Sequence, residues 1–130
     1  MWRRAGAACE YCQVPQSLSL LPFEIDHIMA EKHGGATTLA NLALSCFYDN
    51  NFKGPNIAGI DPRTGRISRL YHPRRYRWHY HFRWDGPYLV GRTAVGRATI
   101  EVLCINHPVR VTQRKALIAA GLFPPRAARP

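Results

Sequence analysis

The order of hydrophobic and polar residues predicts two short strands and one short helix in the first half of the chain. FEIDHIM at 23–29 is an apolar run with the length of a strand, although an Asp-His pair interrupts it. The segment 30–38 contains two consecutive glycines, which mark a turn, and NLALSC at 41–46 predicts a second strand. A helix beginning in the DNN sequence should end at Gly54-Pro55.

The middle of the chain contains a segment of strict period-two alternation. YRWHYHFRW at 76–84 has aromatic residues at even positions and basic residues at odd positions, so a strand would have one aromatic and one basic face. Five large rings are too much apolar surface to leave in water, so we expect them to pack against the rest of the protein. DGP at 85–87 predicts a hairpin into YLVG, and the turn sequence at 60–67 leads into a strand at 67–71.

Two helices are expected to complete the fold. Thr93 can cap a helix over 94–105, which has a broad apolar surface. Asn106 can cap a second helix, with a proline near its first turn and Gly121 past its end. FPPRAARP at 123–130 is expected to be a frayed tail. The pattern as a whole predicts an α+β fold.

The charge balance narrows the class of partner. The 130 residues fit a single domain and include 18 Lys and Arg against 8 Asp and Glu, a formal net charge of +10. Arg heavily outnumbers Lys, and Arg binds phosphate with two parallel hydrogen bonds. Nucleic acid is therefore the expected partner, although charge alone does not exclude a merely soluble basic protein.

Two further features bear on localisation. No apolar stretch approaches the length of a transmembrane helix, so no membrane partner is expected. The N-terminal sequence MWRRAGAA has two arginines but no apolar region after them, so we expect no secretory signal and a cytoplasmic location.

Four cysteines suggest a metal site rather than disulfides. Cys9 and Cys12 form a CxxC pair, and Cys46 begins a second cluster in which Asp49 stands where a second CxxC would end. In a reducing cytosol this spacing favours a structural zinc site. Because a carboxylate oxygen can bind zinc, three thiolates and Asp49 are a chemically possible, though less usual, ligand set. A histidine from elsewhere as fourth ligand, or a site that has lost zinc, are the alternatives. Cys104 is expected to be a buried thiol on an apolar helix face.

The ordered set CEYC and FEIDHIMAEKHGGATTLANLALSCFYDNNFKG resembles the HNH endonucleases over residues 9–54. The resemblance implies a ββα-metal core, here extended by a β-hairpin and two C-terminal helices over 55–122. It implies that His27 is the general base and that Asp26 and Asn50 bind the catalytic divalent ion, Mg²⁺ or Mn²⁺. Asn41 would hold the loop that orients His27.

The chemistry of these residues is consistent with those roles. Phosphodiester hydrolysis needs a nucleophile, a base that deprotonates it and a positive charge near the leaving oxygen. Successive residues on a strand point to opposite sides, so Asp26 and His27 can have different tasks. Asp and Asn oxygens suit a hard divalent ion, and a neutral imidazole is a competent base. Taken singly, Asp26 could cap a turn and His27 could be a core histidine.

The sequence thus predicts an HNH endonuclease that hydrolyses DNA, most simply double-stranded DNA, by metal-assisted attack of water. The alternatives are a zinc-stabilised nucleic-acid-binding module without catalysis and an RNA-directed nuclease. Phosphate contacts are expected from the basic face of 76–84, which includes His79 and His81, and from neighbouring basic residues. The residues predicted to bind nucleic acid are Lys53, Arg74, Arg75, Arg77 and Arg83.

Overall fold

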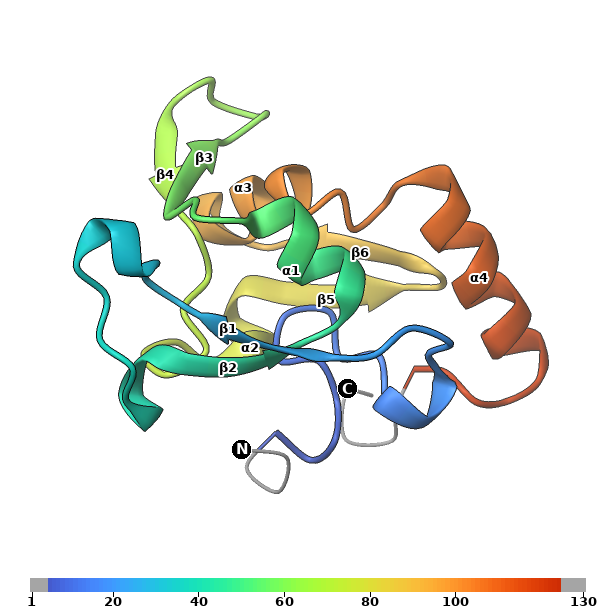
Figure 1. The fold of residues 1–130 in the computed structure, drawn as a ribbon. Coiled ribbons are helices and arrows are strands. Elements are labelled where there is room, and N and C mark those ends of the chain that lie inside the picture. Colours follow the sequence, from blue (N-terminus) through green and yellow to red (C-terminus); the bar gives the residue numbers. More distant parts are fainter. Residues whose placement is uncertain (1–4, 125–130) are drawn as a thin grey trace.

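The computed structural model describes residues 5–124 and has an α+β architecture, as the sequence predicts (Figure 1). Its strands form three separate antiparallel pairs, β1–β2, β3–β4 and β5–β6. The strands are β1 (Glu24–His27), β2 (Leu42–Ser45), β3 (Ala58–Ile60), β4 (Ile67–Arg69), β5 (Phe82–Asp85) and β6 (Tyr88–Gly91). The helices are α1 (Phe47–Lys53), α2 (Trp78–His81), α3 (Ala94–Val102) and α4 (Pro108–Ala119), with short 3₁₀ turns η1 (Gln16–Leu18), η2 (Glu31–His33) and η3 (Leu39–Asn41).

The first half of the chain folds in the predicted order of strand, loop, strand and short helix. β1 pairs with β2 so that Asp26 lies opposite Ala43. Helix α1 begins earlier than expected, because the Cys46 sulfur accepts a hydrogen bond from the Asp49 amide and caps the helix. It ends at Gly54, whose positive φ of 49° a residue with a side chain rarely adopts.

The turn at 60–67 joins two strands, of which the sequence pattern indicated only the second. Asp61 fixes this turn by accepting hydrogen bonds from the Arg63 amide and the Thr64 hydroxyl. Gly59 lies two residues before Asp61. It is so close to α3 that a Cβ at this position would be 2.4 Å from a Val102 methyl group. The β3–β4 hairpin therefore has one face against α3 and the other open.

The prediction of one strand over 76–84 is wrong. Residues 78–81 form the single helical turn α2, and only residues from Phe82 onward form β5. Trp78, His81 and Phe82 are buried, a spacing of three and four that fits a helical turn, whereas Tyr80 is 70% exposed. The predicted aromatic and basic faces therefore do not exist as such, but the hairpin from β5 into YLVG is confirmed.

The C-terminal helices are confirmed with altered ends. Thr93 caps α3 by accepting a hydrogen bond from the Gly96 amide, but the helix stops at Val102 rather than at 105. His107, not Asn106, caps α4, because the Asn106 carboxamide is used to bind both backbone groups of Leu89 in β6. Phe123 is buried, so the tail begins later than predicted, and residues 125–130 lie outside the described part of the chain.

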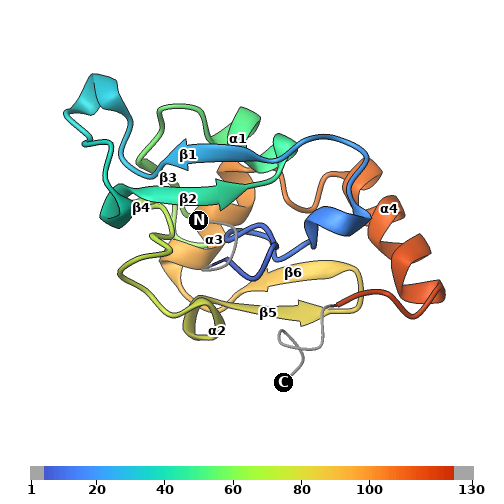
Figure 2. The same ribbon diagram turned by 60° about the horizontal axis from the view of Figure 1, so that its bottom comes forward.

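The core joins the first half of the chain to the second. Figure 2 shows the β1–β2 and β5–β6 hairpins on either side of the N-terminal segment. Tyr11 in that segment is fully buried, and its carbonyl accepts a 2.8 Å hydrogen bond from the Trp78 indole. Among residues 5–124, no helix has the length and apolar character needed to cross a bilayer.

Candidate metal centre and catalytic pair

The predicted zinc ligands come together in one buried cluster. One ligand atom from each of Cys9, Cys12, Cys46 and Asp49 lies within 4.8 Å of all the others. The Cys12 and Cys46 sulfurs are 3.8 Å apart, which is close to the edge of a tetrahedron with Zn–S bonds of about 2.3 Å. Three thiolates and a carboxylate are a chemically suitable donor set for zinc. The cluster can therefore hold a metal ion with Asp49 in the fourth position.

A cation from the C-terminal half lies against this cluster. Arg110 of α4 makes a buried 2.9 Å ion pair with Asp49 and places a second guanidinium nitrogen 3.9 Å from the Cys46 sulfur. Burial and the nearby Cys12 together raise the pKa of Asp49 to about 7, against the lowering effect of Arg110. Hydrogen bonds from Cys46 and Cys9 lower the pKa of Cys12 well below its usual value. Arg110 therefore offsets negative charge that would otherwise be buried without a partner.

Cys104 is not part of the cluster. It lies two residues beyond the end of α3 with a φ of 50°, and it is only partly buried. The prediction of a buried thiol on a helix face is therefore wrong, because the helix ends before this residue.

Asp26 is buried between the cysteine segment and helix α1. Its carboxylate accepts a 2.7 Å hydrogen bond from the Tyr11 hydroxyl and lies 3.1 Å from the Lys53 ammonium. Burial raises the pKa of Asp26, while the Lys53 charge and the Tyr11 hydrogen bond act in the opposite direction.

Lys53 does not have the surroundings expected of a phosphate contact. The residue is 1% exposed, and besides Asp26 its ammonium binds the His27 carbonyl at 3.1 Å. Its position on the last turn of α1 directs the side chain inward toward β1, so the structure gives Lys53 the role of an ion-pair partner for Asp26.

His27 lies on the other side of β1 from Asp26, as the alternation of a strand requires. Its side chain is 27% exposed. The Nε2 atom is 2.9 Å from the Thr37 hydroxyl and 3.3 Å from a carboxylate oxygen of Glu31. Both partners come from the loop between β1 and β2, so this loop sets the orientation of the imidazole.

Asn41 holds that loop with three hydrogen bonds. Its carboxamide accepts from the Met29 amide at 2.9 Å and donates to the carbonyls of Met29 and Ala36 at 2.9 and 2.8 Å. Gly35 makes this closure possible, because a Cβ there would lie 1.7 Å from the Met29 carbonyl oxygen. These contacts fix both ends of the loop that contacts His27.

Asn50 lies on α1, three residues before Lys53, and is half-buried. Its carboxamide has no hydrogen-bond partner among the described residues, so it is available as a ligand. The neighbouring Asn51 is exposed.

The remaining predicted nucleic-acid-binding residues differ in their surroundings. Arg75, Arg77 and Arg83 are exposed, whereas Arg74 is partly buried in an ion pair with Glu10. His81 is buried, and its Nδ1 lies 2.6 Å from the Thr93 hydroxyl, so it does not belong to a basic surface.

Three residues of the site were not predicted from the sequence. Tyr11 binds Asp26, and Thr37 and Glu31 contact His27. The sequence places Tyr11 inside the CxxC pair, but it does not indicate that the Tyr11 side chain points toward Asp26. Glu31 and Thr37 are ordinary polar loop residues, and no sequence pattern distinguishes them.

Comparison with protein families supports the resemblance found in the sequence. The model of the HNH endonuclease family matches residues 9–56, which contain the cysteine cluster, Asp26, His27, Asn41 and Asn50. Comparisons with curated proteins and with solved structures found no significant match. Residues 9–56 of this chain are thus an HNH endonuclease domain.

Proposed function

We propose that this protein hydrolyses phosphodiester bonds of DNA, with His27 as general base and with Asp26 and Asn50 as ligands of one divalent ion. β1, β2 and α1 would form the ββα-metal unit. The observation that carries the proposal is the arrangement around β1, where Asp26 and His27 face opposite sides and Asn41 fixes the adjoining loop.

The surroundings of His27 support a role as a base. Because Nε2 is held by Thr37 and Glu31, the Nδ1 atom remains to accept a proton from water. A carboxylate at 3.3 Å favours the tautomer that has its proton on Nε2. That tautomer leaves the lone pair on Nδ1, as a base requires.

The residues around Asp26 fit a hard divalent ion. A carboxylate has about four lone-pair sites, and Tyr11 and Lys53 occupy part of them. The Asn50 carboxamide, which has no hydrogen-bond partner in the described part of the chain, would add a second oxygen ligand that carries no charge. When bound, Mg²⁺ or Mn²⁺ would supply positive charge for the leaving oxygen.

The cysteine cluster is proposed to be a structural zinc site. All four residues of the cluster are buried, as is usual for a structural rather than a catalytic metal site. Zinc would fix the N-terminal segment that carries Tyr11, and Arg110 would balance the charge of the ligands.

The overall charge and the exposed arginines support nucleic acid as substrate. A net charge of +10 favours association with a polyanion, and Arg75, Arg77 and Arg83 are available to phosphates. DNA rather than RNA is the proposal, and cleavage of matched DNA and RNA substrates at equal salt would decide between them.

A plasmid-nicking assay with Mg²⁺ or Mn²⁺ tests the proposed activity. Wild type should nick supercoiled DNA, a chelator should stop the reaction, and His27→Ala should bind DNA without nicking it. His33→Ala is the matched control, since His33 is an exposed histidine in the same loop. Equal nicking by wild type and His27→Ala would eliminate the proposed base.

One observation favours the alternative of a DNA-binding module without catalysis. The Lys53 ammonium lies 3.1 Å from Asp26, where a divalent ion would have to compete with it. In that case wild type would bind DNA, would bind no divalent ion apart from zinc, and would nick at no greater rate than His27→Ala.

A further inference from the structure

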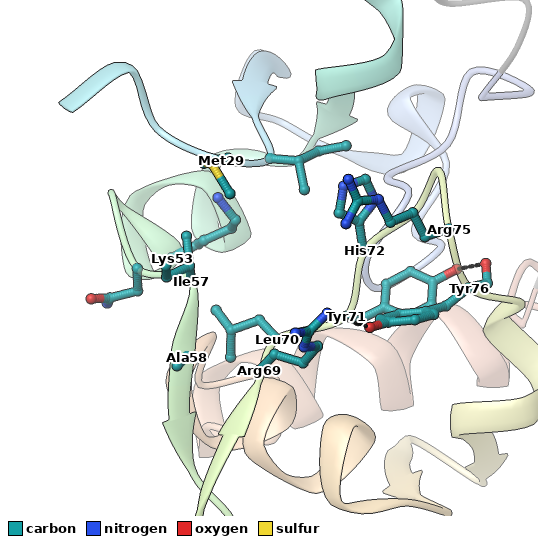
Figure 3. Close-up of a pocket in the computed structure, with 12 residues that line it drawn as sticks. Met29, Lys53, Ile57, Ala58, Arg69, Leu70, Tyr71, His72, Arg75 and Tyr76 are labelled. Atoms are coloured by element: carbon teal, nitrogen blue, oxygen red, sulfur yellow. Dashed lines mark hydrogen bonds between the residues drawn. The ribbon is translucent and has the colours of Figure 1, made fainter. Parts of the chain in front are cut away.

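A pocket with a cavity volume of about 390 Å³ opens beside the proposed catalytic pair (Figure 3). It lies between the chain that continues from β1 and the β3–β4 hairpin. Met29 and Lys53 border one side, and Leu70, Tyr71 and Tyr76 border the other. Its size falls within the range of small-molecule sites in proteins, about 300–1,000 Å³.

The lining of the pocket combines apolar and basic groups. Ile28, Leu70 and Tyr71 are buried and form apolar wall, and the partly exposed Tyr76 adds a second ring. The basic side chains are Arg69, Arg75, His72 and Lys53, and none of the twelve lining residues is acidic. A ligand that suits this lining has a flat apolar ring and a negative charge.

The aromatic and basic groups of the pocket are held in place by their neighbours. The Tyr71 and Tyr76 ring centroids are 6.3 Å apart, and an Arg69 guanidinium nitrogen lies 3.3 Å from the Tyr76 hydroxyl. Arg69 and Arg75 are both exposed, so their charge remains available at the mouth of the pocket. Burial and the nearby Arg75 lower the pKa of His72, which keeps its ring neutral near pH 7.

The lining of the pocket includes the residues that follow the proposed base in the chain. Ile28 and Met29, both in the lining, directly follow His27, so at most about 7 Å of chain separates the two places. Lys53 is common to both places, because the residue lines the pocket and its ammonium donates a hydrogen bond to the His27 backbone carbonyl.

We propose that this pocket binds one unstacked nucleotide of the substrate, adjacent to the bond that is cut. The base would contact the tyrosine rings and the apolar wall, and its phosphate would contact Arg69 and Arg75. The inference rests on the proposed nuclease function and adds a substrate class to it: DNA with an unpaired nucleotide, as in bulges, flaps and single strands. Matched duplex would bind less well, because a base must first be extruded from the stack.

The test measures DNA binding without catalysis. Fluorescence anisotropy would compare a matched DNA duplex with the same duplex carrying one bulged nucleotide, using the His27→Ala variant without divalent ion at fixed salt. The bulged duplex should bind about tenfold more tightly than the matched one, as expected for the stacking of a single base.

Two pairs of variants in the His27→Ala background locate the effect. Ile57→Trp should fill the pocket and remove the preference for the bulge, while Ile60→Trp, a change at an exposed residue of the neighbouring strand outside the pocket, should retain it. Arg75→Gln should weaken binding of the bulged duplex more than of the matched duplex. Arg63→Gln, at the exposed hairpin turn, should weaken both equally.

Two results would overturn the inference. One is equal binding of bulged and matched duplexes by His27→Ala, and the other is a preference that Ile57→Trp retains. None of these binding measurements depends on cleavage. A failed nicking assay would therefore contradict the proposed function, whereas only the two binding results above would contradict the inference about the pocket.

Discussion

Tyr11 lies between the two cysteines of the CEYC segment, and its hydroxyl donates a 2.7 Å hydrogen bond to Asp26. The residue is fully buried, and the Trp78 indole binds its carbonyl. The candidate zinc cluster and the proposed catalytic ion site are therefore joined through one side chain. A change in the geometry of the cluster should therefore alter the position of the Asp26 carboxylate through Tyr11, without any direct contact between the two sites.

Replacing Tyr11 by Phe should preserve the fold and impair the proposed ion site. Loss of a hydrogen bond to a buried carboxylate should lower the free energy of unfolding by about 1–3 kcal/mol. The nicking rate should fall because Asp26 is held less firmly. Tyr88→Phe, at a 46% exposed tyrosine, is the control and should change neither quantity. Wild-type stability and activity in Tyr11→Phe would show that the hydrogen bond has no role.

The cysteine cluster should hold about one zinc ion per chain. Elemental analysis of the purified protein should find that zinc in wild type and in Asp49→Cys, which restores the usual thiolate. Cys12→Ser should lose it and melt at a lower temperature, whereas Cys104→Ser should not, since Cys104 lies outside the cluster. A folded wild type free of zinc would mean that the cluster is a metal-free buried network.

Asn41→Ala should free the loop that orients His27. Its three hydrogen bonds to Met29 and Ala36 would be lost, so amide hydrogen exchange should increase in the residues after β1. Misplacement of the base can lower the nicking rate by up to about a hundredfold. Unchanged exchange in the loop together with unchanged activity would contradict the assignment of Asn41 as a positioning residue.

The ion pair between Asp61 and Arg97 should give the β3–β4 hairpin a defined dependence on pH. Arg97 binds both Asp61 oxygens at 2.9 Å, and these hydrogen bonds hold the pKa of Asp61 well below its ordinary value. A lowered pKa in the folded state gives stability that is present above the unfolded value of about 3.9 and is lost as the pH falls toward the folded value. The difference in melting temperature between wild type and Asp61→Asn should therefore be constant from pH 7 to about 5 and shrink below about 4.

The corresponding control is Asp85→Asn, at an exposed residue of the other hairpin. The difference in melting temperature between wild type and Asp85→Asn should not shrink as the pH falls below about 4. A gap between wild type and Asp61→Asn that persists unchanged into acid would contradict the assignment.

The local signals in the sequence were reliable where spacing alone determines the outcome. The strand at 23–29 and the turn glycines predicted β1 and the loop, because both depend on near neighbours in the chain. The cysteine cluster joins two distant segments, and it was predicted because each segment has the ligand spacing of a zinc site. The period-two alternation of 76–84 misled because Trp78, His81 and Phe82 also fit a helical spacing of three and four. The burial of those three side chains favours the helical turn over the strand. Because burial depends on tertiary packing, the local sequence could not distinguish the two.

The partners of the site residues could not be predicted from local sequence. Lys53 lies 27 residues from Asp26 and Arg110 lies 61 residues from Asp49, and both pairs form only when distant elements pack together. A lysine at the end of a short helix in a basic chain is expected to be solvated, so its burial against Asp26 was not foreseen.

The most direct measurement for the central proposal is the binding of Mn²⁺ by zinc-loaded protein, followed by calorimetry. Wild type should bind one Mn²⁺ per chain, and Asp26→Asn and Asn50→Ala should each lower the affinity for Mn²⁺. The double variant should have an affinity only a little lower than that of either single variant, because the two residues share one ion. Asn51→Ala, at the exposed neighbour, should bind as wild type does. Wild-type affinity in Asn50→Ala would contradict the account, since Asp26 and Asn50 would then not hold a common ion.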